Sequence, residues 1–177
     1  MNPPTQWPPR PATIEEMMLQ ALAMEREAVA RYSELADIME THNNREVAEL
    51  FQRMAGYEQH HVDHILEDMH WPRNIVTPRY GGIWTAPDGP EAVPLEDMHY
   101  LMLPWHALQL ALAAEQRAHD FFDGLAREAA SDAIRKAALE MRAEEAEHVE
   151  LVRAWLAKVP QPDSDWAADP DPPRHTD

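Results

Sequence analysis

The sequence predicts an all-α protein, an antiparallel four-helix bundle built from two similar helical hairpins that a long crossover joins. Three observations indicate this fold. The sixteen prolines all lie in residues 3–11, 72–104 and 160–173, which leaves 12–71 and 105–159 without the residue that breaks helices. Both proline-free stretches are rich in Ala, Leu, Met, Glu and Arg, which are strong helix formers. Both also carry apolar side chains three or four residues apart, the spacing of one buried helix face.

Capping signals divide each proline-free stretch into two helices. The runs "TIEE" at 13–16 and "NNRE" at 43–46 have the spacing of a capping box. In the second stretch Pro104 suits a first helical position, and Ser131 suits an N-cap. The predicted helices therefore span about 13–40, 44–70, 104–130 and 131–158.

The connections predict how the helices are arranged. The links inside each pair are short, so each pair should form an antiparallel hairpin. The crossover, about 71–103, is long enough to travel the full length of a bundle. The bundle domain then covers 13–158, while 1–12 and 159–177 are expected to be flexible, proline-rich tails. Trp166 is a candidate for docking the second tail.

Composition limits the partners that the protein can have. The chain has 32 acidic and 15 basic residues, a formal charge of −17, which argues against nucleic acid or an anionic membrane as partner. It has no run of eighteen apolar residues and no signal peptide pattern, so we expect a cytoplasmic protein. The absence of cysteine excludes disulfides and thiolate ligands. Any bound metal would therefore have oxygen and nitrogen ligands.

Each predicted helix carries a glutamate in the middle of its apolar stripe. In the second and fourth helices a histidine follows that glutamate by one helical turn. A lone interior glutamate usually reaches the surface, but four ionised carboxylates together would repel each other and lose hydration. Two divalent cations would offset the four charges, so the set predicts a dinuclear metal site. Its members are Glu25, Glu58, His61, Glu115, Glu145 and His148.

Positions along the helices place the four glutamates at one level. Glu25 lies 15 residues before residue 40 and Glu58 lies 14 residues after residue 44, which is about 21–22 Å from the turn in both cases. Glu115 and Glu145 lie equally far from the second turn. The two hairpins also align as copies, at offsets of 90 and 87 residues, which supports a pseudo-twofold bundle with a shared site on its axis.

This ligand set resembles that of the ferritin-like superfamily, in particular its rubrerythrin and bacterioferritin-type dimetal carboxylate proteins, over residues 13–158. The resemblance implies that Glu25 and Glu115 are ligands, that Glu58 and Glu145 bridge the metals, and that His61 and His148 each bind one metal. Three further residues are candidates for supporting the ligands through hydrogen bonds: Tyr32, His64 and His119. Packing alone would explain Tyr32 nearly as well, and a position on the helix flank is the simpler explanation for His64 and His119.

The sequence departs from these relatives in several ways. It has no cysteine-ligated rubredoxin domain, and Ala118 stands where rubrerythrins carry an additional ligand glutamate. Gln59 stands where bacterioferritin has a haem-ligating methionine, so we predict no haem. A tail rich in Pro and Asp replaces the fifth helix that helps ferritin cages to close, which argues against a 24-subunit store.

The resemblance implies a di-iron oxidoreductase that reacts with dioxygen or hydrogen peroxide, with electrons from an unidentified donor. Two iron ions are the expected cofactor, and manganese is the runner-up because mixed oxygen and nitrogen ligands admit both metals. The alternatives are a ferroxidase for iron storage or detoxification, a manganese catalase-like peroxide dismutase, and a metal-free helical interaction protein. A homodimer that buries an outer helix face is also compatible with the sequence.

Overall fold

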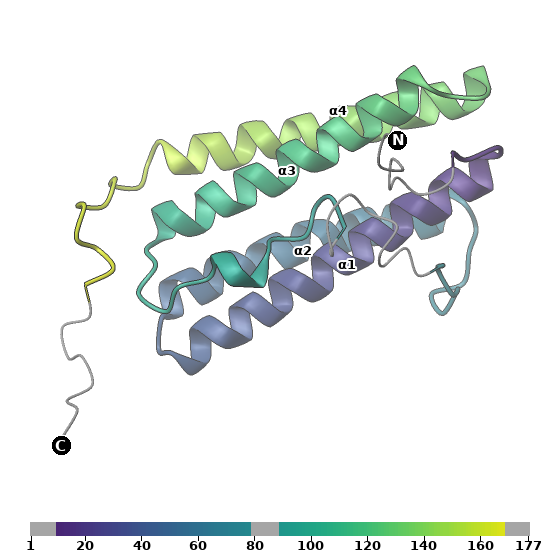
Figure 1. Ribbon diagram of the computed structural model, residues 1–177. Coiled ribbons are helices and arrows are strands. Elements are labelled where there is room, and N and C mark those ends of the chain that lie inside the picture. Colours follow the sequence, from purple (N-terminus) through teal and green to yellow (C-terminus); the bar gives the residue numbers. More distant parts are fainter. Residues whose placement is uncertain (1–9, 79–88, 169–177) are drawn as a thin grey trace, which may run out of the picture.

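The computed structural model describes residues 10–78 and 89–168, and within them it contains four long α-helices, one short 3-10 helix and no strand. The helices form two hairpins that lie against each other as a bundle (Figure 1). This arrangement confirms the predicted all-α four-helix fold. The outer parts of both expected tails lie outside the described residues. The elements are α1 (Ile14–Thr41), α2 (Arg45–Asp68), η1 (Leu95–Asp97), α3 (Pro104–Arg127) and α4 (Asp132–Leu156).

Side-chain caps begin two of the helices at the predicted positions. Thr13 Oγ1 accepts a hydrogen bond from the N–H of Glu16 at 3.1 Å. Ser131 Oγ accepts one from the N–H of Ile134 at 3.2 Å. Each bond satisfies a backbone donor that has no partner inside the helix. Pro104 is the first residue of α3, where its missing N–H costs nothing.

The start of α2 uses its polar residues differently from the predicted capping box. Asn43 adopts a left-handed φ of 58°, and Asn44 precedes the helix without a side-chain capping bond. The Nδ2 group of Asn44 instead donates to the carbonyl oxygen of Met102 at 2.7 Å. The run at 43–46 therefore predicts the helix start correctly. The Asn44 side chain, however, bonds to the end of the crossover instead of capping the helix.

Helices α2, α3 and α4 end earlier than predicted, and α4 stops at Leu156 rather than near residue 158. Residue 70 was the expected end of α2, but the helix stops at Asp68 because His70 takes a φ of 55°, which no right-handed helix accepts. Helix α3 stops at Arg127 rather than near residue 130. Ser131 caps α4 from an extended conformation, with φ −148°, so the residues before it must reverse the chain.

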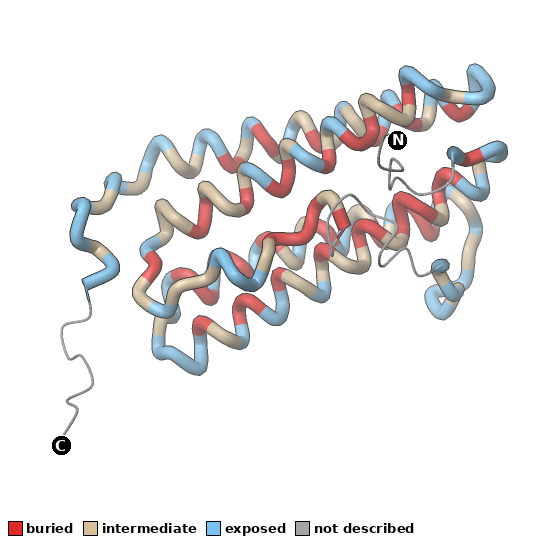
Figure 2. Tube along the Cα trace, in the orientation of Figure 1, coloured by how far each residue is buried: buried red, intermediate tan, exposed pale blue. Residues whose placement is uncertain are grey.

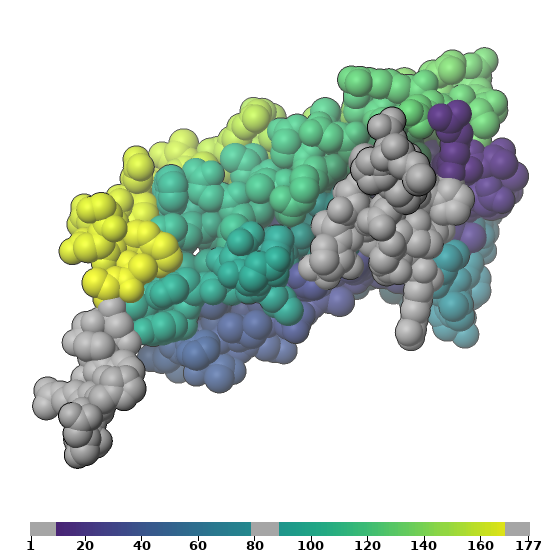
Figure 3. All heavy atoms as spheres, viewed as in Figure 1, coloured from purple at the N-terminus to yellow at the C-terminus, as the bar shows by residue number. Residues whose placement is uncertain are grey.

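The crossover joins opposite ends of the bundle, as its predicted length allows (Figure 1). Helix α2 ends beside the start of α1, whereas α3 begins beside the α1–α2 turn at the other end (Figure 1). The first part of the crossover is attached to α1, because Arg26 donates to the carbonyl oxygens of Ile75 and Arg73 at 2.7 and 3.0 Å. Its last part, 89–103, lies over the boundary between α1 and α3 (Figure 3). No described helix is both long and apolar enough to cross a membrane.

Two hydrophobic clusters fill the interior, with the central glutamates between them. The first lies toward the start of α1 and includes Leu22 and Phe122. The second lies toward the α1–α2 turn and includes Phe51. Buried residues follow the inward face of all four α-helices (Figure 2). This arrangement surrounds a polar layer with apolar side chains on both sides.

Trp166, in the C-terminal segment, packs on the second cluster. Its ring lies 3.8 Å from that of His106 and 5.2 Å from that of His99, centroid to centroid. The prediction that this tryptophan docks on the bundle is confirmed.

Candidate metal centre

The four helices bring their central glutamates into one layer. Glu25, Glu58, Glu115 and Glu145 each have 0% of their surface exposed, and each comes from a different helix. A carboxylate that is fully withdrawn from water loses several kcal/mol of hydration free energy, even after the protein relaxes. The equal heights that were predicted from residue counting are confirmed, since potential ligand oxygens of these residues lie within 4.8 Å of one another in overlapping groups.

The two imidazoles face this layer from α2 and α4. His61 Nδ1 lies 3.4 Å from Glu25 Oε2, and His148 Nδ1 lies 3.3 Å from Glu115 Oε2. The two rings are stacked with centroids 4.5 Å apart and planes at 8°. Each imidazole is therefore paired with the glutamate of a neighbouring helix, which defines a His61 side (Glu25, His61) and a His148 side (Glu115, His148).

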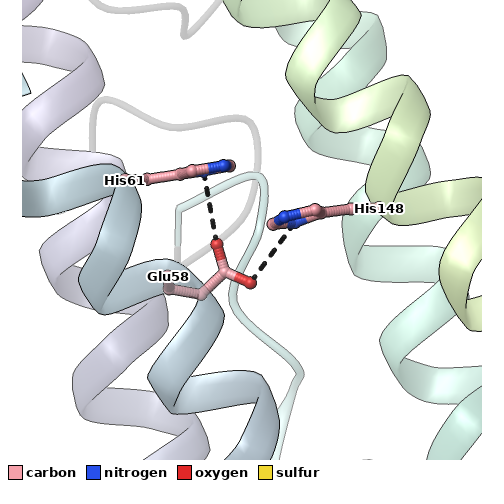
Figure 4. A group of neighbouring side chains, drawn as sticks. All are labelled: Glu58, His61 and His148. Carbon is pink, nitrogen blue, oxygen red and sulfur yellow. Dashed lines mark ion pairs between the residues drawn. The ribbon is translucent and has the colours of Figure 1, made fainter. Parts of the chain in front are cut away.

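Glu58 and Glu145 lie between the two sides. One oxygen of Glu58 is 3.7 Å from Nδ1 of His61 and its other oxygen is 3.7 Å from Nδ1 of His148 (Figure 4). Glu145 shares one group of potential ligand atoms with Glu25 and His61, and another with Glu115 and His148. Within each group the ligand atoms lie within 4.8 Å of one another. Glu58 and Glu145 are therefore the two carboxylates that approach both sides.

Three of the four central glutamates lack the donors that buried carboxylates need. Both oxygens of Glu25, Glu58 and Glu145 have no hydrogen-bond partner among the described residues. Buried ionised groups are stable only when they are paired or bind a cation. An ensemble of carboxylate oxygens and imidazole nitrogens suits iron, manganese or zinc rather than a soft ion. The residues therefore fit a dimetal site on the chemistry of their own donor atoms.

The pKa values of the layer point the same way. Burial, followed by the charges of the neighbouring glutamates, raises the pKa of Glu58 and of Glu145 well above 4.5. Burial lowers the pKa of His61, but its close pairing with Glu25 and the charges of the nearby carboxylates outweigh that effect and raise the pKa overall. The raised pKa values favour protonated carboxyl groups in the absence of a cation, and a bound cation would displace those protons.

The candidate supporting residues have different outcomes. The Tyr32 hydroxyl donates to Glu115 Oε1 at 3.3 Å, and burial beside that carboxylate raises the pKa of the phenol. His64 is at the surface and reaches the layer only through Glu144, whose two oxygens lie 3.6 Å from His64 Nδ1 and 3.8 Å from His61 Nε2. His119 lies on the helix flank, 3.0 Å from Asp120, and does not join the layer.

One carboxylate of the layer, Glu91, is not in the set of ligands that the sequence predicts. Glu91, from the crossover, is 1% exposed and forms a potential ligand group with Glu25 and Glu58. Burial and the charges of Glu25 and Glu58 raise its pKa well above 4.5. The helical periodicity that revealed the other glutamates does not extend to a proline-rich segment. The only signal was a lone acidic residue within "GPEAVP".

Comparison with known proteins finds two similarities. A family model described as Rubrerythrin matches residues 16–79. A crystal structure at 2.00 Å of an uncharacterized conserved protein from Magnetospirillum magnetotacticum MS-1 is 35% identical, with a TM-score of 0.65. The alignment covers 85% of this chain and 98% of that one. No curated protein matches the chain.

Proposed function

This chain belongs to the rubrerythrin-type proteins of the ferritin-like superfamily, and we propose that its central layer binds two iron ions that react with dioxygen or hydrogen peroxide. The observation that carries the proposal is the position of Glu58, with one oxygen toward each imidazole. That position supports a site for two ions rather than one. Iron bound there would supply the electrons that reduce the oxidant, one from each ion.

The side chains have distinct roles in this proposal. Glu25 and His61 hold one ion and Glu115 and His148 hold the other, while Glu58 and Glu145 bind both. The Tyr32 hydroxyl restricts Glu115 by donating to one of its oxygens, so the other oxygen stays toward His148. The hydrophobic clusters on both sides of the layer limit the access of bulk water.

Loading with metal tests the binding proposal directly. The metal-free protein, titrated anaerobically with Fe(II), should bind about two ions per chain. Replacing the shared ligand by Glu58→Ala should abolish binding of at least one ion. Glu147→Ala is the matched control, because Glu147 is exposed on α4 beside His148. This variant should bind as many Fe(II) ions as the wild type. A wild-type protein that binds neither Fe(II) nor Mn(II) would contradict the proposal.

The reaction is tested by mixing the ferrous protein with hydrogen peroxide and, separately, with dioxygen. We expect oxidation of the bound iron in step with reduction of the oxidant. A cage-sized particle that accumulates many irons per chain would instead indicate a ferroxidase for storage. Oxygen release from peroxide by the manganese form would indicate a catalase-like dismutase.

A further inference from the structure

The crossover places a fifth carboxylate in the layer. Glu91 is 1% exposed, and neither of its oxygens has a hydrogen-bond partner among the described residues. One of them lies within 4.8 Å of potential ligand oxygens of both Glu25 and Glu58. If the crossover served only to cover the bundle, an apolar residue at this position would avoid the cost of burying a carboxylate.

The backbone on both sides of Glu91 is attached to two helices. The N–H of Gly89 donates to Glu27 Oε1 on α1 at 2.9 Å. Arg117 on α3 donates to the carbonyl oxygens of Pro90 and Ala92, at 2.7 and 3.1 Å. These bonds bracket Glu91 and leave its side chain as the part of the segment that extends into the layer. An arrangement of this kind holds a ligand in place before a metal binds.

We propose that Glu91 is a metal ligand supplied by the crossover on the His61 side, and that metal binding fastens segment 89–103 to the bundle. This inference rests on the proposed dimetal function. It assigns the crossover a part in the metal centre, in addition to joining the two hairpins.

The extra carboxylate makes the two metal positions unequal. Glu91 groups with Glu25 and Glu58, whereas the groups that contain His148 do not include it. The ion on the His61 side therefore has one more anionic ligand and should bind more tightly. With five buried carboxylates the formal charge of the carboxylates and the ions together would be −1 for two divalent ions and +1 for two trivalent ions. Four carboxylates would leave two excess positive charges in the trivalent state.

Glu91→Gln is the informative variant, because it keeps the shape of the side chain and removes its charge. Glu96→Gln is the matched control, since Glu96 lies on the same crossover but is exposed in η1. Anaerobic calorimetric titration with Fe(II) or Co(II) should resolve two unequal affinities in the wild type. Glu91→Gln should weaken the tighter one at least ~10-fold, while Glu96→Gln should leave both unchanged.

Hydrogen exchange provides a second readout that does not depend on activity. Amides of residues 89–103 should exchange more slowly once metal is bound to the wild type or to Glu96→Gln. Glu91→Gln should lose most of this metal-dependent protection. The metal-free variant should unfold at a temperature no lower than the wild type, because it has one buried ionisable group fewer. This result would distinguish the loss of a ligand from misfolding.

The outcomes separate this inference from the proposed function. Two bound ions in Glu91→Gln, with wild-type affinities and wild-type protection of 89–103, would overturn the role of Glu91 and leave the dimetal function standing. Failure of the wild-type protein to bind metal would overturn both.

Discussion

At the scale of single residues, the two imidazoles have different surroundings although their helices align as copies. His61 Nε2 lies 3.8 Å from Glu144 Oε2. At the offset of 87 residues, the counterpart of Glu144 is Tyr57, whose ring meets that of His148 edge-on at 5.8 Å. A carboxylate behind a histidine ligand fixes its orientation and makes it more basic. The pseudo-symmetry of the ligands therefore does not extend to the residues behind them.

Glu144→Gln should weaken metal binding on the His61 side. The amide cannot provide the negative charge that a carboxylate offers to His61 Nε2, and a loss of about 10-fold in affinity is expected for one ion of two. Calorimetric titration of the metal-free wild type and variant measures this change in affinity. Equal losses for both ions, or none, would show that Glu144 does not support His61.

Tyr32→Phe should destabilise the metal-free protein by about 1 kcal/mol, because it removes the donor to a fully buried carboxylate oxygen of Glu115. Denaturant unfolding in the presence of a chelator measures the change. The metal stoichiometry should stay at the wild-type value, since the phenol is not among the proposed ligands. A variant as stable as the wild type would mean that the 3.3 Å contact contributes nothing.

At the scale of the helices, local signals account for most of the boundaries. Thr13, Pro104 and Ser131 start helices where the sequence predicts, because capping depends only on neighbouring residues. The early end of α3 depends on the reversal that connects it to α4. Asn44 departs from its predicted role because Met102, distant in sequence, offers its side chain another partner.

Gly56→Ala should stabilise the protein by about 0.5–1 kcal/mol. Gly56 lies inside α2, and a Cβ atom there would meet no atom within 4 Å beyond its chain neighbours and the nearby backbone of its own helix. Alanine loses less backbone entropy than glycine on entering a helix. Gly124→Ala in α3 is the parallel test, because its Cβ position is equally open. Thermal unfolding of both variants should show higher midpoints than the wild type. A lower midpoint would show that the added methyl group clashes with a neighbouring atom.

At the scale of the whole molecule, the acidic layer couples stability to pH and to metal. Glu58, Glu91 and Glu145 have pKa values well above 4.5 because they are buried close together. In the metal-free protein the folded state therefore keeps protons that the unfolded chain releases. Folding stability falls as pH rises wherever the folded state binds more protons. The raised pKa of His61 acts in the same direction.

The metal-free protein should lose stability as the pH rises from about 5 to 8, and Glu145→Gln should show a smaller loss because one raised carboxyl group is gone. Saturating metal should reverse the trend, since cations displace these protons and bind more tightly at higher pH. Urea unfolding at a series of pH values, with chelator and with metal, measures both slopes. Stability of the metal-free protein that increases over this range would contradict the assignment.

The sequence by itself determined the four helices and the inward position of six ligand candidates. Proline placement and helical periodicity act over a few residues, and two short turns set the level of each glutamate. Only the tertiary structure decided that Glu91 joins the layer and that Glu144 lies behind His61. The crossover has no regular period, so the direction of its side chains depends on bonds such as those from Arg117, which form after the helices pack. Contacts between distant segments are a property of the packed bundle and leave no local pattern in the chain.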